Sequence, residues 1–311
     1  MVGAGAIGGY FGGRLLEAGR DVTFLVRPRR AAQLAATGLI IKSAAGDATL
    51  SRPPTVLAEH LATPFDLILL SCKAYDLAGA IVSFAPAVGP ATAILPLLNG
   101  MRHIDLLVER FGAERVLGGQ CIIAATLDET GAIRHLNQDH ELTFGERGGG
   151  LSDRTRAIAR VMEGARFTAR ASEQIMQEMW EKWVFLATLA GSTCLMRAAI
   201  GDIVQSTGGR EFLLGLLAEC RAIAEGAGFA QRPAFAERIQ ATLTATGSTF
   251  TASMLRDIER QAPIEADHII GDLIRRARPS EEALPLLRLA FTHLQAYEAR
   301  LKRTPSATGK N

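Results

Sequence analysis

Apolar and polar positions follow two different rhythms in the first half of the chain. Short apolar runs bounded by turn-forming or charged residues are typical of buried strands, and three occur: DVTFLV (21–26), FDLILLSC (65–72) and ATAILPLL (91–98). Helical spacing of apolar residues predicts helices at about 6–18, 28–37, 75–85 and 102–111. Strands that alternate with helices predict a parallel sheet covered by helices on both faces.

The rhythm changes further along the chain. The runs VLGGQCIIAATL (116–127), AIRHL (132–136) and ELTFGE (141–146) predict strands that close the sheet with antiparallel pairs. After about residue 170 only helical spacing remains, at 172–201, 210–228, 233–245, 251–260, 265–278 and 281–302. We therefore predict an α/β domain at 1–168, an all-α domain at 169–303 and a mobile tail at 304–311.

Composition narrows the class of protein. The 311-residue chain is 48% hydrophobic, which suffices for two packed domains, and its net charge of +2 does not favour nucleic acid as a partner. We recognise no signal peptide and no apolar stretch long enough for a membrane span. Cys72, Cys121, Cys194 and Cys220 lack metal-binding spacing, so we expect reduced thiols, no metal site and a cytoplasmic location.

The sequence GAGAIG, which starts at Gly3, has the G-x-G-x-x-G spacing of a dinucleotide-binding loop. Gly5 would let the backbone approach a pyrophosphate, Gly8 would let the next helix pack on the sheet, and Ala6 and Ile7 complete the loop. Only two residues come before the loop, so we expect a first strand shortened by truncation or by a late start codon. A glycine-rich turn that binds no phosphate is the alternative.

The second predicted strand ends in FLVRPRR, where an NAD site would place an acidic residue for the ribose 2′-hydroxyl. No Asp or Glu occurs between positions 24 and 36, and Arg27, Arg29 and Arg30 stand there instead. Guanidinium groups suit a 2′-phosphate, so the predicted cofactor is NADP(H), with Arg27 as its first contact. The alternative is a solvated basic turn.

Lysine is rare, with five among the 34 basic residues. One of the five, Lys182, lies between the two tryptophans of the chain, Trp180 and Trp183, where an apolar helical run begins. In a chain that otherwise uses Arg, this placement predicts a compact charge with a chemical role. The alternative is a lysine whose ammonium group reaches solvent from a helix end.

Further ordered motifs extend the pattern over nearly the whole chain. LLSCKAYD places Lys73 after a predicted strand, PLLNGM places Asn99 after the next, and ASMLRDIERQAPIEAD supplies Ser253, Asp257 and Glu265. Together with GAGAIGGYFGGRL and WEKW, these motifs make the chain resemble the ketopantoate reductase (2-dehydropantoate 2-reductase) family. The resemblance implies a Rossmann-type N-terminal domain and an all-α C-terminal domain like that of 6-phosphogluconate dehydrogenase. Taken singly, Asp257 would be a surface charge on a helix.

The resemblance also implies a reaction, in which NADPH gives a hydride to the ketone carbon of a 2-oxo acid. Lys182 would polarise the ketone oxygen and donate its proton. Asn99 would hold the substrate and the nicotinamide ribose, and Lys73 would lie beside the cofactor. Ser253 would bind the substrate carboxylate, and Glu265 would act in catalysis where cofactor and substrate meet. Taken singly, Ser253 is equally well a helix cap and Glu265 a first-turn carboxylate.

The helix after Lys182 departs from the family pattern. The family usually has asparagines four and eight residues after the lysine, on the same helix face, whereas this chain has Leu186 and Ala190. Ketopantoate carries a hydroxyl that such amides can bind, and a buried unpaired hydroxyl costs roughly 1–3 kcal/mol. The apolar face favours a bulkier or less hydroxylated 2-oxo acid.

We therefore expect NADPH-dependent reduction of a 2-oxo acid, which by resemblance is ketopantoate on the way to pantoate and pantothenate. The open alternatives are a reductase of a different 2-oxo acid and an NADP(H)-binding protein without catalysis. A dehydrogenase of polyol phosphates or sugar acids would need a cluster for the phosphate or acid group, and we find none in the sequence. The expected partner is the small 2-oxo acid, with a homodimer left open and neither nucleic acid nor a membrane expected.

Overall fold

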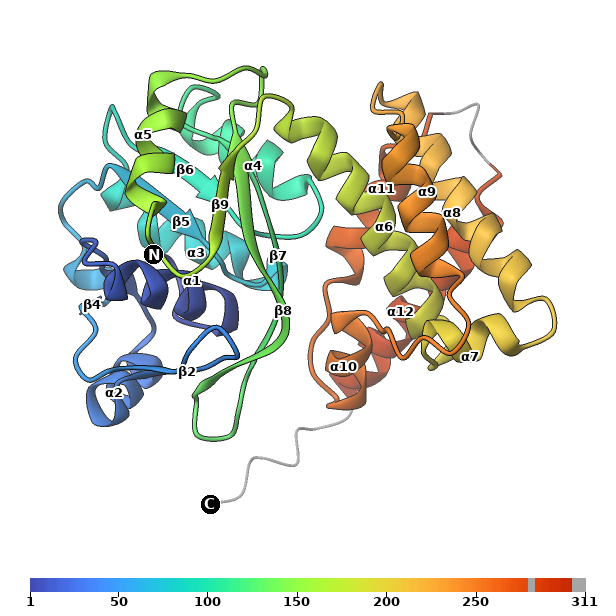
Figure 1. Cartoon of the computed structure of the whole chain (residues 1–311), viewed down its shortest axis with the longest axis horizontal. Coiled ribbons are helices and arrows are strands. Elements are labelled where there is room, and N and C mark those ends of the chain that lie inside the picture. Colours follow the sequence, from blue (N-terminus) through green and yellow to red (C-terminus); the bar gives the residue numbers. More distant parts are fainter. Residues whose placement is uncertain (279–282, 304–311) are drawn as a thin grey trace. The chain divides into compact units, whose positions relative to one another are not determined.

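A computed structural model describes residues 1–278 and 283–303, so the predicted tail at 304–311 lies outside the described residues. The chain forms two compact units, which we call the sheet unit (Met1–Leu98 with His103–Met176) and the helical unit (Asn99–Arg102 with the chain from Gln177 onward). Strands occur in the sheet unit, and the described part of the helical unit contains helices and loops (Figure 1). The predicted combination of an α/β domain and an all-α domain is confirmed.

The parallel sheet has Met1 and Val2 at its centre. Val2 bridges Leu25 on one side and Leu70 on the other, and its amide donates to the Leu69 carbonyl at 2.8 Å. The flanking strands give the order β4–β1–Val2–β5–β6, with bounds Thr55–Val56, Phe24–Leu25, Leu67–Leu70 and Ala93–Pro96. All of these pairs are parallel. The loop that starts at Gly3 therefore leaves the middle of a parallel sheet, where a dinucleotide-binding loop is expected.

Helix α1 (Ala6–Glu17) packs between this sheet and a second one, and its glycines make the close packing possible. A Cβ added at Gly12 would come within 2.6 Å of the Phe24 ring, which belongs to the parallel sheet. A Cβ at Gly9 would come within 2.5 Å of the Ile133 side chain, which belongs to the second sheet. The sequence GGYFGG is thus short of side chains on both sides of the helix because two sheets approach it.

The second sheet has the strand order β3–β2–β8–β7, with β9 also paired to β8; their bounds are Ala48–Leu50, Leu39–Lys42, Ile133–Gly145, Gly118–Leu127 and Thr168–Ala171. The predicted strands at 132–136 and 141–146 form one strand, β8, which pairs with β7 in this sheet instead of closing the parallel one. The polar residues at 137–140 are the reason that the sequence predicts two strands instead of one. The Asn137 side-chain oxygen accepts from the Ala124 amide at 2.9 Å where the register shifts, so a polar side chain replaces a ladder bond.

The helices predicted in this half are confirmed, with small shifts at their ends. Besides α1, the chain up to Met176 forms α2 (Pro28–Thr37), η1 (Ala58–His60), η2 (Ala74–Asp76), α3 (Leu77–Phe84), η3 (Ala85–Ala87), α4 (Arg102–Phe111) and α5 (Asp153–Met162). Burial is concentrated where α1 meets the strands, with Tyr10, Phe11, Phe24 and Phe144 fully enclosed.

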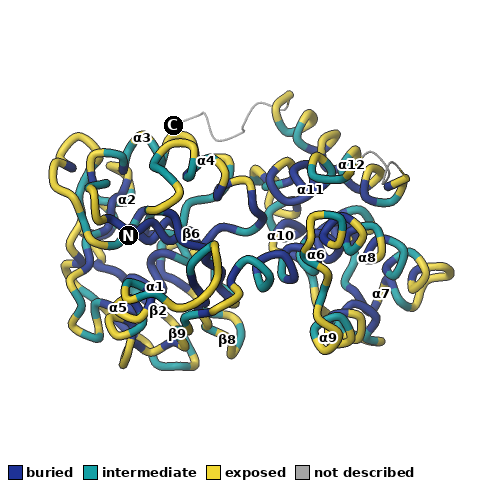
Figure 2. The backbone as a smooth tube through the Cα atoms, turned by 90° about the horizontal axis from the view of Figure 1, so that it is seen from above, coloured by how far each residue is buried: buried dark blue, intermediate teal, exposed yellow. Residues whose placement is uncertain are grey.

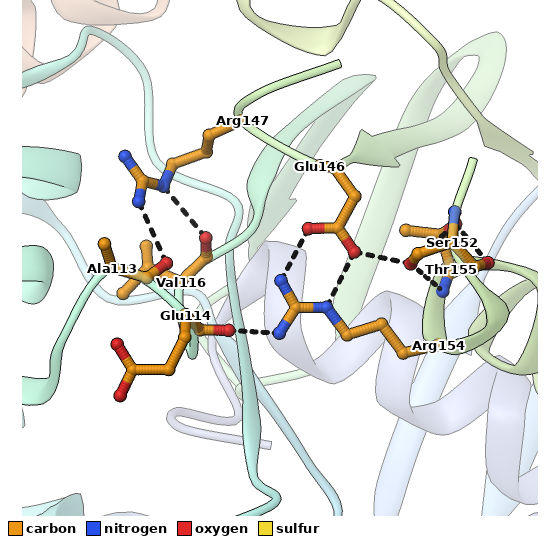
Figure 3. Close-up of polar contacts among 8 residues, drawn as sticks. All are labelled: Ala113, Glu114, Val116, Glu146, Arg147, Ser152, Arg154 and Thr155. Atoms are coloured by element: carbon orange, nitrogen blue, oxygen red, sulfur yellow. Dashed lines mark hydrogen bonds and ion pairs between the residues drawn. The ribbon is translucent and has the colours of Figure 1, made fainter. Parts of the chain in front are cut away.

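A network of charged side chains fixes the connection between β8 and α5 (Figure 3). Arg154 donates two hydrogen bonds to the Glu146 carboxylate, from Nε at 2.7 Å and from Nη2 at 2.5 Å. Ser152 donates to the same carboxylate at 2.5 Å and caps α5 with its side-chain oxygen. Arg147 donates to two carbonyls in the segment after α4, both at 2.9 Å. The hydrogen bond from Arg154 holds the pKa of Glu146 below its ordinary value, so this network stays charged near neutrality.

The helical unit is organised around α6 (Ile175–Met196), which is largely buried (Figure 2). The other helices are α7 (Ile200–Gln205), α8 (Gly209–Gly226), α9 (Pro233–Leu243), α10 (Ser253–Glu259), the π-helix η4 (Asp267–Gly271), α11 (Asp272–Arg275) and α12 (Pro285–Arg303). The helix predicted at 172–201 is divided after Met196, because Arg197 adopts a left-handed backbone with φ 54°. The helix predicted at 265–278 begins as a π-helix, which apolar spacing alone does not distinguish from an α-helix.

Candidate functional site

The glycine loop has the shape that its spacing predicts. Gly8 packs so closely that an added Cβ would lie 2.3 Å from the Gly3 carbonyl oxygen and 2.1 Å from Ser71 Oγ. Gly5 is the N-cap of α1, and a Cβ added there would meet no atom of the described residues within 4 Å. Among the residues that the structure describes, no side chain caps the first turn of α1, so its amides face an open backbone corner, as an anion site requires.

Arg27 and Arg30 have different surroundings, although the sequence placed them in one basic turn. The Arg27 side chain is 74% exposed and donates to Asp76 Oδ1 at 2.6 Å, and this hydrogen bond raises the pKa of Arg27. Arg30 is half-buried, and its Nε donates to the carbonyl oxygen of Ala4 in the glycine loop at 2.9 Å. Arg30 therefore supports the loop, and Arg27 remains the candidate for a cofactor phosphate.

Lys73 and Asp76 follow β5 in one short segment, three positions apart. Lys73 is the half-buried N-cap of η2, and Asp76 is the last residue of η2. The ion pair with Arg27 joins this segment to the end of β1, which is the neighbouring strand beyond Val2. Residues at the carboxyl ends of parallel strands thus gather on one edge of the sheet, which is where ligands bind in open α/β sheets.

In the helical unit, the turn at Asn99 and Gly100 packs against η4. Gly100 has φ 79°, and an added Cβ would lie 2.9 Å from the His268 carbonyl oxygen, so a side chain fits neither the backbone nor the space. The Asn99 backbone hydrogen-bonds the His268 ring, while burial of that ring lowers the pKa of His268. These contacts fix Asn99 beside a segment that begins directly after Ala266 and Glu265.

Two arginines, one before η4 in the sequence and one after it, donate hydrogen bonds to Asp267, the first residue of η4. Arg102 Nη1 donates to Asp267 Oδ2 at 2.6 Å, and Arg275 Nη1 donates to Asp267 Oδ1 at 2.7 Å. The hydrogen bond from Arg275 is the main reason that the pKa of Asp267 lies below its ordinary value. The Asn99 turn is therefore tied to η4 by charge as well as by backbone packing.

The second tryptophan joins α6 to the same π-helix. Trp183 Nε1 donates to the Ile269 carbonyl oxygen at 2.8 Å, and both groups are buried. The Arg276 guanidinium lies 5.6 Å from the centre of the Trp183 ring. Because Lys182 precedes Trp183, this bond holds the turn of α6 that carries Lys182 to the segment that follows Glu265.

Lys182 and its neighbours occupy different faces of α6. Lys182 is half-buried, whereas Trp180 and Trp183 are 3% and 1% exposed and pack in the core, with Trp180 stacked on Phe229. Successive helix positions are about 100° apart, so Lys182 does not share a helix face with either tryptophan. Lys182 thus lies between the two tryptophans in the sequence but not on the surface of the helix.

Glu181, next to Lys182, is completely buried and was not singled out in the sequence. It receives hydrogen bonds from Arg232 Nη2 at 2.5 Å, Arg232 Nε at 2.9 Å and the Arg232 amide at 3.0 Å, with Gln177 at 3.2 Å. Burial by itself would raise the pKa of Glu181, but these hydrogen bonds outweigh it and leave the pKa lowered. The signal available in the sequence was a carboxylate in an otherwise apolar helix, which requires a partner.

Ser253 lies at the other end of the Lys182 face. It is the exposed first residue of α10, whose N-cap is Ala252, so Ser253 is not the helix cap. The Ala252 amide donates to Thr193 Oγ1 at 3.3 Å. Thr193 is eleven residues after Lys182, about 16 Å along the axis and on nearly the same face. Leu186, half-buried, and Ala190, buried, lie between them.

The helical unit thus brings the Asn99 turn, the Lys182 turn and the segment after Glu265 together on η4, with Ser253 further along α6. The glycine loop, Arg27 and Lys73 belong to the sheet unit. Asp76, Glu181, His268 and the anchoring role of Trp183 were missed in the sequence, because each depends on a partner distant along the chain.

Two models of known protein families match the chain. The model of the family described as ketopantoate reductase PanE/ApbA matches residues 1–149, and the model of its C-terminal part matches residues 174–298. The chain belongs to the ketopantoate reductase family. The family predicted from the motifs is confirmed.

Individual relatives cover nearly the whole chain. The oxidoreductase YkpB of Bacillus subtilis strain 168 is 38% identical over 96% of this chain and 98% of its own, and its name states no substrate. A 2-dehydropantoate 2-reductase of Geobacter metallireducens GS-15 is 28% identical, covers 95% of this chain and 98% of its own, and superposes with a TM-score of 0.85. A D-mandelate dehydrogenase solved with NADH and anilino(oxo)acetate, 21% identical, covers 97% of this chain and 100% of its own, and shares the fold with a TM-score of 0.86. Within the described part of the chain, no helix is long and apolar enough to cross a membrane.

The buried Glu181 generates a stability prediction. Replacing it by Gln should lower the free energy of unfolding by about 2–3 kcal/mol at pH 7, because charge-assisted hydrogen bonds from Arg232 are weakened in a buried position. Urea denaturation of Glu181→Gln measures this loss, and Glu237→Gln, at an exposed position of α9, is the matched control.

The same comparison has an expected pH dependence. A carboxyl group with a lowered pKa in the folded state contributes stability above its unfolded pKa of about 4.3, and this contribution is lost as the pH falls through the folded-state pKa. The gap between wild type and Glu181→Gln should therefore be full at pH 7 and shrink below about pH 4. A gap that stays constant down to pH 3 would contradict the ionised pair.

Proposed function

We propose that this protein is an NADPH-dependent oxidoreductase that reduces a 2-oxo acid to a 2-hydroxy acid. The observation that carries the proposal is the junction at η4. The turn with Lys182 and the turn with Asn99 are both bound to the helix that follows Glu265. These are the residues to which the family motifs assign proton donation and substrate binding. They come together from three distant parts of the chain.

The cofactor part of the proposal rests on the sheet unit. The open corner at Gly5 and the uncapped start of α1 fit a pyrophosphate, and the exposed guanidinium of Arg27 fits a 2′-phosphate. The absence of a carboxylate between positions 24 and 36 supports NADP(H) over NAD(H). Lys73, which follows the neighbouring strand, would lie beside the cofactor. When bound, NADPH supplies the hydride for the ketone carbon.

The remaining chemistry falls to side chains of the helical unit. The Lys182 ammonium group would hydrogen-bond the ketone oxygen, stabilise the negative charge that develops there and donate the proton that completes the hydroxyl. Asn99 would orient the substrate and the nicotinamide ribose, and Ser253 would donate to the substrate carboxylate. Glu265 would accept hydrogen bonds from the cofactor and keep the polar groups around the ketone in place.

Ketopantoate, and with it a role in pantothenate biosynthesis, is the reference substrate because the family carries its name. A cytoplasmic location and a homodimer remain predictions from the sequence. The competing proposal is a protein that binds NADP(H) without catalysis. Its support is the pair Leu186 and Ala190, which replace amides near the candidate proton donor.

Lys182 separates the two proposals. Lys182→Ala should lower kcat/KM with 2-oxo acids by about 10²- to 10⁴-fold, because it removes the proton donor, and should leave the NADPH dissociation constant within about twofold. Loss of NADPH absorbance measures turnover, and cofactor fluorescence measures binding. Lys302→Ala, at an exposed position of α12, is the control. A wild-type protein that binds NADPH tightly but reduces no 2-oxo acid would support the non-catalytic proposal.

The two inner glycines of the loop should fail in different ways. Gly5→Ala should keep its melting temperature and weaken NADPH binding at least about tenfold, because the added methyl group fits the protein but occupies the approach of the pyrophosphate. Gly8→Ala should lose about 1–3 kcal/mol of stability, because its Cβ would overlap the Gly3 carbonyl oxygen. Thermal melts and cofactor titrations on both variants make the comparison, and equal behaviour of the two would count against a phosphate at Gly5.

Arg27 should decide the choice between the two nicotinamide cofactors. Arg27→Ala should weaken NADPH binding about 10- to 100-fold and change NADH binding less than about threefold, since NADH lacks the phosphate. Arg29→Ala removes a neighbouring exposed arginine and serves as the control. Equal losses for NADPH and NADH would mean that Arg27 does not contact the 2′-phosphate.

A further inference from the structure

The polar side chains of α6 after Lys182 are occupied by the helix itself. Thr188 Oγ1 donates to the Val184 carbonyl at 2.9 Å, Ser192 Oγ to the Thr188 carbonyl at 2.7 Å, and Thr193 Oγ1 to the Leu189 carbonyl at 2.7 Å. All three hydroxyl groups are buried. These hydroxyl groups therefore donate their protons to backbone carbonyls of the same helix. Beyond Lys182, the helix carries no side-chain amide that could bind a substrate hydroxyl.

The next turn after Lys182 is apolar and partly open. Phe185 and Leu186 are half-buried and lie three and four residues after Lys182, so their side chains neighbour the lysine on the helix surface. Phe250 stacks on Phe185 with ring centres 6.0 Å apart and planes 14° apart. The Phe250 side chain nevertheless remains 42% exposed.

The segment that carries Phe250 runs along the Lys182 face of α6. Its Phe250 ring contacts Phe185, and two residues later the Ala252 amide reaches Thr193. Ser253 follows directly. The partly open ring of Phe185 therefore lies within one helical turn of Lys182, the candidate partner of the ketone oxygen, and the Phe250 ring lies against it.

We propose that Phe185, Leu186 and Phe250 form the subsite for the substrate side chain, and that the substrate is a 2-oxo acid with an aromatic side chain and no hydroxyl group on it. This inference rests on the proposed reduction of a 2-oxo acid. A planar ring extends the parallel Phe185–Phe250 pair and removes the exposed part of Phe250 from water. A hydroxyl group at the same place loses its water partners and meets only carbon atoms.

Matched substrates test the hydroxyl part of the inference. Ketopantoate and 3,3-dimethyl-2-oxobutanoate differ by one hydroxyl group, so their ratio isolates that group from shape. We expect kcat/KM to be about 10- to 100-fold higher for the compound without the hydroxyl, and higher again for phenylglyoxylate. Ketopantoate turnover equal to or above that of the other two overturns the inference while leaving the proposed reaction intact.

Variants test the location of the subsite. Phe250→Ala should lower kcat/KM for phenylglyoxylate about 10- to 30-fold, mainly through KM, and change kcat/KM for pyruvate less than about threefold, since a methyl group does not reach the rings. Leu289→Ala, at an exposed apolar position of α12, is the matched control. Equal losses for phenylglyoxylate and pyruvate, or no loss for either, would mean that Phe250 does not line the subsite.

Binding keeps the inference testable if the protein reduces no 2-oxo acid, which would be a failure of the proposed function. Calorimetry with NADP⁺-loaded protein should then give at least about tenfold tighter binding of mandelate than of pantoate, and Phe250→Ala should abolish the difference. Equal affinity for the two hydroxy acids would overturn the aromatic subsite by a measurement that does not depend on turnover.

Discussion

The bond from the Trp183 indole to the Ile269 carbonyl is the interaction on which the candidate site depends. A π-helix disturbs the regular ladder of backbone hydrogen bonds, and a buried carbonyl without a partner costs roughly 1–3 kcal/mol. The Trp183 indole donates to a buried carbonyl of this π-helix from the neighbouring helix. It thereby fixes the distance between the helix that carries Lys182 and the segment after Glu265. A phenylalanine would fill similar space but has no N–H to donate.

The glycine-rich start of the chain serves two purposes with one type of residue. Gly5 leaves an open corner at the end of the parallel sheet, whereas Gly8 lets α1 approach Gly3 and Ser71, and Gly9 and Gly12 let it lie against two sheets. The fold and the proposed cofactor site are consequently inseparable in this helix. A side chain at Gly5 would occupy the open corner, whereas side chains at Gly8, Gly9 and Gly12 would overlap neighbouring atoms of the protein.

Much of this organisation could be read from the sequence, because it depends on local periodicity. The alternation of strand and helix, the long helical half and the family motifs are all properties of short stretches. The strands β2, β3, β4 and β9 were missed because each has four residues or fewer and carries no long apolar run. Ion pairs between residues distant in the sequence could not be predicted either. Arg27 with Asp76, and Glu181 with Arg232, join residues that are 49 and 51 positions apart. The two tryptophans that flank Lys182 in the sequence do not enclose it, because neighbours in sequence lie about 100° apart on a helix.

Asn99–Arg102 belongs to the helical unit, although the residues before and after it belong to the sheet unit. The chain therefore makes a four-residue excursion and passes between the units three times in all. Packing of Gly100 on His268 and the ion pair of Arg102 with Asp267 hold this segment to the helical unit, although the strand before it belongs to the sheet unit. Asn99 therefore belongs to the same unit as Lys182 and Glu265, whereas the glycine loop belongs to the sheet unit. The residues proposed to bind the substrate thus share one packed unit, and contacts within that unit set their mutual geometry.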